Sequence, residues 1–212
     1  VLERQAENTN VLLPDSYNES MTLILGSLIP SDYPYIFGGF EQYYPKGHQS
    51  VEDKDQRIVI VPHEINKTAL KDIETWLKRL KFEFIFYSQK DKLQNSRVLI
   101  VDEVGILADL YSYSNIAYVG AGFGAGVHSV FEPAVYHNAM SFGPNFHIVD
   151  MAVSLLNNNL ASVIANAEDF VQFCTLMENE EKLEKIRADI KDYILKQPIA
   201  AEQITEAIFS HD

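Results

Sequence analysis

The sequence predicts an α/β domain built on a doubly wound parallel sheet of six or seven strands. Three observations support this prediction. Short, continuous apolar runs recur along the chain, as expected of strands that are buried on both faces. Helical patterns separate most of these runs, which favours parallel strands joined by right-handed crossovers. Glycine or polar residues directly follow several runs, where the carboxyl ends of parallel strands form a binding site.

The predicted strands are the apolar runs themselves. In chain order they are 21–26, 57–61, 82–87, 98–101, 116–119, 139–142 and 161–164. The predicted helices lie between them, at 67–81, 105–113, 128–137 and 149–157. The helix at 67–81 has the clearest pattern, because Leu70, Ile73, Leu77 and Leu80 recur at spacings of three and four. Two or three further helices are expected from 167 to 209, with a break near Gln197-Pro198.

The segment from Tyr33 to Gln56 is harder to interpret. It contains prolines and glycines among its aromatic residues, at Pro34, Gly38, Gly39, Pro45 and Gly47. We expect an irregular loop here, with at most a short helix.

Composition excludes several classes of protein. A chain of 212 residues that is 47% hydrophobic can bury one good core. The formal charge of −13 argues against a general nucleic-acid binder and against an electrostatic membrane anchor. No apolar run approaches the roughly 20 residues that span a bilayer. The single cysteine, Cys174, excludes an internal disulfide and lies on an apolar helical face, where we expect a small core residue.

Residues that follow the predicted strands should meet at one edge of the sheet. They are Gly26 and Ser27, His63 and Glu64, Asp102 to Gly105, Gly120 to His128, and Gly143 to Asn145. Ligands of open parallel sheets bind beyond this edge.

The loop from Gly120 to His128 is the strongest functional signal. It has four glycines in seven positions, and glycine lets backbone N–H groups approach an anion closely. The helix expected after it would direct its positive end at the same place. The alternative is a turn whose glycines serve only strand–helix packing.

The same loop fits the loose form of a dinucleotide-binding fingerprint, from Gly120 to Ala125. That fingerprint normally opens the first strand–helix–strand unit and has an acid about 20 residues later for the ribose. The window around Met140 has no acid. We therefore reject NAD binding.

Glu132 lies four residues after His128, which predicts a position one turn further along the same helix. A carboxylate there can accept hydrogen bonds from vicinal ribose hydroxyls while His128 and the glycines hold a phosphate. Pro133 supports a place in the first turn, because proline is tolerated only near the start of a helix. The alternative is a carboxylate that only complements the helix dipole.

Metal sites are not indicated. Asp53-Lys54-Asp55 imitates a metal-binding D-x-D motif, but it sits in a charged run that we interpret as a solvated loop. His137, His147 and His211 have no partner at metal-ligand spacing.

Several short motifs follow one another in order between about Leu23 and Ala152. They are Gly26-Ser27, Val61-Pro62-His63-Glu64, Val104-Gly105-Ile106-Leu107, the loop from Gly120 to Gly126, His128-Ser129, Glu132-Pro133-Ala134 and Phe142-Gly143-Pro144-Asn145. Together they resemble the C-terminal domain of the Kdo (3-deoxy-D-manno-octulosonic acid) transferases. Three features depart from that family's pattern: Ser129 stands where asparagine is usual, no arginine precedes His63, and the segment 33–56 does not show the family's helix.

The resemblance implies a Rossmann-like doubly wound domain, the C-terminal half of a GT-B glycosyltransferase, with C-terminal helices. Residues 1–20 would be an N-terminal helix and linker from the other half, 21–196 the donor-binding domain and 197–212 a C-terminal helix. The donor would be CMP-Kdo. No metal, no cofactor and no nucleic acid are implied.

The other half of the enzyme would hold the lipid A precursor that accepts Kdo, the catalytic carboxylate and the membrane anchor. Transfer would invert the anomeric centre. This half would be soluble and would work at the cytoplasmic face of the bacterial inner membrane.

The resemblance assigns donor binding to thirteen residues: Ser27, His63, Glu64, Gly105, Ile106, Leu107, Gly122, Gly124, Gly126, His128, Ser129, Glu132 and Asn145. Gly105 with the backbone at Ile106 and Leu107 would meet the base and phosphate. Glu132 would hold the ribose, His128 and Ser129 the phosphate, and Ser27 would face the sugar.

Two other interpretations remain open at this point. The first is another GT-B transferase, or a nucleotide-sugar epimerase, that uses a UDP-sugar. The second is a Rossmann-like binding module without catalytic function, which would bind no nucleotide.

Overall fold

The computed structural model describes residues 11–196, and all structural statements below concern these residues. They form a sheet of seven parallel strands, which confirms the predicted fold class. The strands are β1 (Met21–Leu28), β2 (Gln56–Pro62), β3 (Ile85–Phe86), β4 (Val98–Ile100), β5 (Ile116–Val119), β6 (Ala139–Phe142) and β7 (Ala161–Val163). The spatial order is β3-β4-β2-β1-β5-β6-β7.

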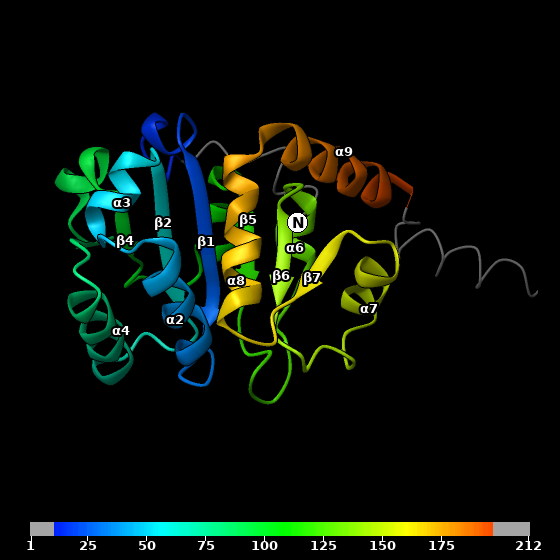
Figure 1. Ribbon diagram of the computed structural model, residues 1–212, viewed down its shortest axis with the longest axis horizontal. Coiled ribbons are helices and arrows are strands. Elements are labelled where there is room, and N and C mark those ends of the chain that lie inside the picture. Colours follow the sequence, from blue (N-terminus) through cyan, green and yellow to red (C-terminus); the bar gives the residue numbers. More distant parts are fainter. Residues whose placement is uncertain (1–10, 197–212) are drawn as a thin grey trace, which may run out of the picture.

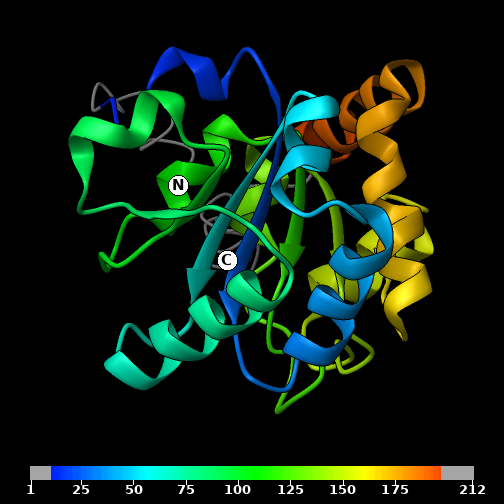
Figure 2. The same ribbon diagram turned by 60° about the vertical axis from the view of Figure 1, so that its left-hand side comes forward.

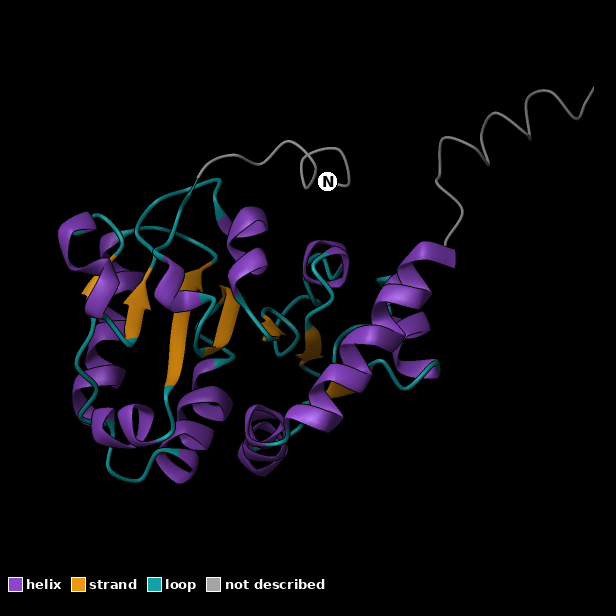
Figure 3. Cartoon of the chain, turned by 90° about the horizontal axis from the view of Figure 1, so that it is seen from above, coloured by secondary structure: helices purple, strands orange, loops and turns teal. Residues whose placement is uncertain are grey.

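Helices cover both sides of this sheet (Figure 3). They are α2 (Tyr33–Tyr43), α3 (His48–Asp53), α4 (Lys67–Arg79), α5 (Leu107–Leu110), α6 (Phe131–Val135), α7 (Asp150–Asn157), α8 (Ala167–Cys174) and α9 (Glu180–Lys196). Short 3₁₀ turns lie at Asp15–Tyr17, Lys90–Asn95, Tyr111–Tyr113 and Thr175–Glu178. The helix expected at the start of the chain and the one expected from 197 onward lie outside the described residues.

Burial on both faces explains the continuous apolar runs. Leu23 and Leu25 of β1 pack into one cluster with α2, α4 and α8, whereas Ile24 packs into a second cluster with Tyr17 and Leu110 on the other face. Consecutive residues of one strand are therefore all buried, and they alternate between the two faces of the sheet.

The segment 33–56 is not an irregular loop, so that prediction was wrong. It forms α2 and α3, and α2 lies beside α8 (Figure 2). Ile36, Phe37 and Phe40 form the buried stripe of α2. Gly39 faces α8, where an added Cβ would lie 2.5 Å from Cδ1 of Phe170. The glycine marks close helix packing rather than a loop.

Three other boundaries differ from the predictions. Only Ile85–Phe86 pairs as a strand within 82–87. The helix expected at 105–113 is a short α5 followed by a 3₁₀ turn. The helix expected at 128–137 covers only Phe131–Val135.

The chain order of the strands reverses direction at one point in the sheet. From β1, the chain moves outward through β2 on one side, and later through β5, β6 and β7 on the other. The carboxyl ends of β1 and its neighbours lie at the bottom of Figure 1. The gap between the loops after β1 and β5 is therefore the topological switch point, where ligands of such sheets bind.

Candidate functional site

A cavity of about 340 Å³ opens at this switch point. Nine residues line it: Ser27, His63, Gly105, Leu107, Ala108, Tyr111, His128, Ser129 and Glu132. Seven of the nine are among the thirteen predicted site residues. The structure thus brings together residues spread over more than one hundred positions of the chain.

Ser27 lies in a bulge near the end of β1. The pairing with β2 shifts register between Leu25 and Leu28, and Ser27 has a φ of 53°. This left-handed conformation is uncommon for a residue other than glycine, and such strain is found often at functional sites. A Cβ at Gly120 would lie 2.3 Å from the carbonyl oxygen of Ser27, so glycine is required where β5 ends against the bulge.

His63 and His128 both line the cavity and stack on each other. Their ring centroids lie 4.3 Å apart at an interplanar angle of 22°. Backbone hydrogen bonds fix both residues: the N–H of His63 donates to the carbonyl of Leu28 at 2.9 Å, and that of His128 to the carbonyl of Gly120 at 3.2 Å. Burial lowers the pKa of His128, and neighbouring His63 lowers it further.

One wall of the cavity follows β4 in the chain. It consists of Gly105, Leu107, Ala108 and Tyr111. Gly105 has a φ of +84° and no atom within 4 Å of an added Cβ, so its conformation rather than crowding favours glycine. Tyr111 is buried, and its hydroxyl lies so close to Gly26 that a Cβ there would be 2.0 Å away. Burial and then the charge of Glu132 raise the pKa of Tyr111 above its usual value.

Glu132 lies in the first turn of α6 and lines the cavity, as Pro133 predicted. The expectation that Glu132 and His128 share a helix was wrong, because α6 begins at Phe131. Instead the hydroxyl of Ser129 accepts the N–H of Phe131 at 3.3 Å, which links the loop to the helix. Pro133 cannot donate a backbone hydrogen bond, and the helix around it stays short.

The glycines of the loop after β5 face other loops. A Cβ added at Gly122 would lie 2.5 Å from the backbone of Gly143. One added at Gly124 would lie 2.7 Å from Cδ1 of Ile29, and one added at Gly126 would lie 2.4 Å from Cδ1 of Ile148. The side chain of Asn145 donates to the carbonyl of Gly124 at 2.8 Å. Gly122, Gly124, Gly126 and Asn145 do not line the cavity, so packing explains their positions, and their contact with a donor stays a prediction.

Glu64 and Ile106 also lie outside the cavity. Glu64 lines an adjoining cavity of about 310 Å³ that shares His63, and it accepts a hydrogen bond from Asn66 at 2.9 Å. Ile106 is half-buried against the core cluster under β4.

Sequence reasoning missed Ala108, Tyr111 and Asp32. Asp32 is fully buried behind the loop after β5, and its carboxylate accepts the N–H of Ala121 at 2.9 Å and the hydroxyl of Tyr118 at 3.1 Å. The only signal for Asp32 was an acidic residue between the first predicted strand and the segment 33–56.

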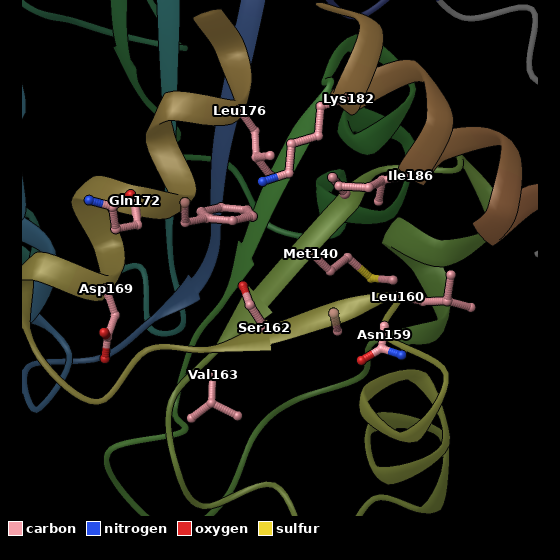
Figure 4. Close-up of a pocket in the computed structure, with 13 residues that line it drawn as sticks. Met140, Asn159, Leu160, Ser162, Val163, Asp169, Gln172, Leu176, Lys182 and Ile186 are labelled. Atoms are coloured by element: carbon pink, nitrogen blue, oxygen red, sulfur yellow. The ribbon is translucent and has the colours of Figure 1, made fainter. Parts of the chain in front are cut away.

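A separate cavity, of about 310 Å³, lies between β6, β7, α8 and α9 (Figure 4). None of the thirteen predicted site residues lines it. Asp169 lines this cavity, and its carboxylate already accepts a hydrogen bond from the N–H of Ala165 at 2.8 Å. We assign no binding role to this cavity.

Neither a metal-binding cluster nor a membrane-spanning helix occurs among residues 11–196. These residues contain no cluster of three or more histidine, cysteine or acidic side chains that could hold a metal ion. Asp53 and Asp55 are exposed and face Lys46 and Arg97 respectively, but Asp53 ends α3, so the run is solvated without being the loop that we predicted. Cys174 is buried, as predicted. No described helix has both the length and the apolar character to cross a bilayer.

Known proteins share this sequence pattern. No protein-family model matches the chain. The chain is 30% identical over 163 residues to the 3-deoxy-D-manno-octulosonic acid transferase of Chlamydia muridarum, which covers 76% of this chain and 36% of that protein. It is 24% identical over 196 residues to the corresponding transferase of Chlamydia trachomatis serovar D, and this match covers 91% of this chain and 43% of that protein. The chain therefore spans less than half the length of these relatives.

The fold is shared with a solved structure, the C-terminal CMP-Kdo binding domain of WaaA from Acinetobacter baumannii. The TM-score is 0.72 at 18% identity, and the match covers 92% of this chain and 98% of that one. Identity this low shows the fold alone, and the sequence relationship comes from the transferases. The chain is thus a relative of the Kdo transferases, as its motifs predicted, with the Rossmann-like fold of a GT-B C-terminal domain.

Proposed function

We propose that this chain is the donor-binding half of a glycosyltransferase that moves Kdo from CMP-Kdo to a lipid A precursor. The observation that carries the proposal is the cavity at the switch point, which gathers seven of the thirteen residues expected to bind the donor. The sequence relationship to Kdo transferases and the fold shared with a CMP-Kdo binding domain support it. The UDP-sugar alternative and the non-catalytic module have no comparable support.

The lining residues suggest how CMP would lie. The base would rest on the wall of Gly105, Leu107 and Ala108, with backbone groups near Ile106 within reach. Glu132 would accept hydrogen bonds from the ribose hydroxyls. Glu132, His63 and His128 line the same cavity, so the ribose and the phosphate would both lie within it.

The histidines would carry the charge of the phosphate. The nine lining residues include no lysine or arginine, so the protein groups there that can become cationic are His63 and His128. With the hydroxyl of Ser129 they would stabilise the negative charge that develops on CMP as the glycosidic bond breaks. Ser27, at the bulge of β1, would face the departing sugar.

The remaining chemistry belongs to the other half of the enzyme in this proposal. An inverting transfer needs a base near the acceptor hydroxyl, on the face of the sugar opposite the leaving group. That base, the lipid-binding surface and the attachment to the cytoplasmic face of the inner membrane would come from the other half. We propose that the reaction needs no metal ion.

Calorimetric titration of the chain with CMP, UDP and NAD tests the proposal. We expect measurable binding of CMP, weak because half of the cleft is contributed by the other domain, and weaker binding of UDP and NAD. Tighter binding of UDP would favour the UDP-sugar alternative. Binding of none of the three at millimolar concentration would favour the non-catalytic module.

A further inference from the structure

Asp32 is a buried carboxylate without an ion-pair partner among the described residues. Its side chain is 0% exposed, and no ion pair among residues 11–196 includes it. Removing a carboxylate from water costs several kcal/mol unless charges or hydrogen bonds compensate.

Three hydrogen bonds compensate this charge, and they come from the loop after β1, the loop after β5 and strand β5 itself. One carboxylate oxygen accepts the N–H of Ile29 at 3.0 Å and the N–H of Ala121 at 2.9 Å. The other oxygen accepts the hydroxyl of Tyr118 at 3.1 Å. Asp32 therefore joins the loop after β1 to the loop after β5, the two loops that flank the switch point.

Ala121 connects Asp32 to the rest of the loop after β5 through its backbone hydrogen bonds. Its φ of 70° is left-handed, a conformation that costs a residue with a side chain about 1 kcal/mol or more and needs outside support. Its carbonyl accepts the N–H groups of Gly124 at 2.9 Å and Gly126 at 3.3 Å. The loop that ends at His128 is thus built on the residue that Asp32 holds.

We propose that Asp32 is a positioning residue for the donor phosphate, which fixes the loop 120–128 so that His128 meets the phosphate and which supplies a compensating negative charge behind that histidine. This inference rests on the proposed function. Asp32 acts through the loop and through His128, not by touching the donor.

The charges around His128 agree with this role. His63 stacks on its ring, and Glu132 and Tyr111 line the same cavity. Burial and then His63 lower the pKa of His128, whereas the charge of Asp32 raises it. A bound phosphate would add a second negative charge on the open side, so CMP affinity should rise as the pH falls through the pKa of free His128.

Asp32→Asn separates charge from shape. The amide oxygen of asparagine can accept both backbone N–H groups, and its NH₂ group can donate to the hydroxyl of Tyr118. The variant keeps the hydrogen bonds and loses the charge. Tyr118→Phe is the matched control, because it removes one hydrogen bond of the same carboxylate and keeps the charge.

The test measures CMP affinity by calorimetry across the histidine range of pH, together with the pKa of His128 by NMR in the absence of nucleotide. For Asp32→Asn we expect CMP affinity about three- to tenfold lower near neutral pH, from a His128 pKa lowered by about half a unit to one unit. Tyr118→Phe should stay within about twofold of the unaltered chain. Melting curves report the fold of each variant.

The outcomes separate the two proposals. An unchanged His128 pKa and unchanged CMP affinity in Asp32→Asn would overturn the role of Asp32, even if the unaltered chain binds CMP. A lowered His128 pKa in a chain that binds no CMP would sustain the coupling and refute the donor-binding function. If Asp32→Asn does not fold, Asp32→Glu replaces it: the longer side chain keeps the charge but displaces the carboxylate, so unchanged CMP affinity in that variant would equally overturn the inference.

Discussion

At the scale of single residues, side chains at or just beyond the carboxyl ends of β1, β2 and β4 meet in one cavity. Ser27, His63 and Gly105 could be placed because parallel strands end at one edge, and that edge is fixed by the sheet. The mutual geometry of His128 and Glu132 could not be predicted from their spacing, because the helix starts three residues later than the pattern suggested. Asp32 was missed because a buried acid without a cation runs against the usual reading of charged residues as exposed.

Glu132→Gln tests the ribose contact. If Glu132 accepts hydrogen bonds from the ribose, the variant should lose about 1–3 kcal/mol of CMP binding free energy, the scale of a hydrogen bond to a charged group. Its melting temperature should change little, because Glu132 is only half-buried. Calorimetry and thermal melting measure the two effects.

Glu103→Gln is the control for that experiment. Glu103 is exposed, pairs with Lys90 at 3.4 Å and does not line the cavity. It should bind CMP as the unaltered chain does. A sharp loss of stability in Glu132→Gln with full CMP affinity would make Glu132 a structural residue of α6.

His137 should make stability depend on pH. Burial lowers its pKa, and Lys191 and Arg187 lower it further. The unfolded chain therefore binds more protons than the folded chain between the folded pKa and about 6.5, so the free energy of unfolding rises with pH in that window. This contribution is complete above about pH 6.5 and is lost as the pH falls through the folded pKa.

His137→Asn should remove this contribution, because asparagine tolerates the φ of 58° at this position. We expect its melting temperature to fall less than that of the unaltered chain between about pH 7.5 and about pH 5.5. Parallel pH dependence of the two proteins would show that His137 does not titrate differently in the folded and unfolded chains.

At the scale of elements, strands and the longer helices followed from the sequence, whereas α2 did not. Its buried residues have the spacing of a helix, but Pro34, Gly38 and Gly39 obscured it. Pro34 is tolerated in the first turn. Gly39 is needed because α8 packs against it, and a tertiary contact of that kind cannot be recognised from local sequence.

Gly38 and Gly39 make a matched test of this packing. A Cβ at Gly39 would lie 2.5 Å from Phe170, whereas a Cβ at Gly38 meets only Ala167, at 3.5 Å. Gly39→Ala should lower the free energy of unfolding by about 1–3 kcal/mol through overpacking. Gly38→Ala should raise it by about 0.5–1 kcal/mol, because alanine favours the helix. Equal effects of the two substitutions in chemical denaturation would contradict the packing of α2 on α8.

At the scale of the whole molecule, the sheet order places the site more firmly than any single motif. The loops after β1 and β5 are neighbours only because the chain reverses between those strands. The sequence predicted parallel strands but not their order. The glycine-rich loop was found by its composition, yet its glycines pack against Gly143, Ile29 and Ile148, a role that only the assembled sheet reveals.

The proposed division of labour predicts that this chain alone does not transfer Kdo. Among the acids of residues 11–196, Glu132 is the one that lines the cavity, and the proposal assigns it to the donor. A transfer assay with CMP-Kdo and a lipid A precursor should show no product for residues 1–212. Transfer should return when the N-terminal half of a Kdo transferase is joined before Val1, and product formed by residues 1–212 alone would show that the base lies within this chain.

Mapping of CMP onto the chain by NMR tests the central claim most directly. Isotope-labelled protein titrated with CMP should show shifted amide signals at Ser27, Gly105, His128 and Glu132, which line the switch-point cavity. Amides of Ser162 and Lys182, in the cavity of Figure 4, should stay unchanged. Shifts confined to that separate cavity, or no shifts at saturating CMP, would contradict the account of this chain as a CMP-binding donor domain.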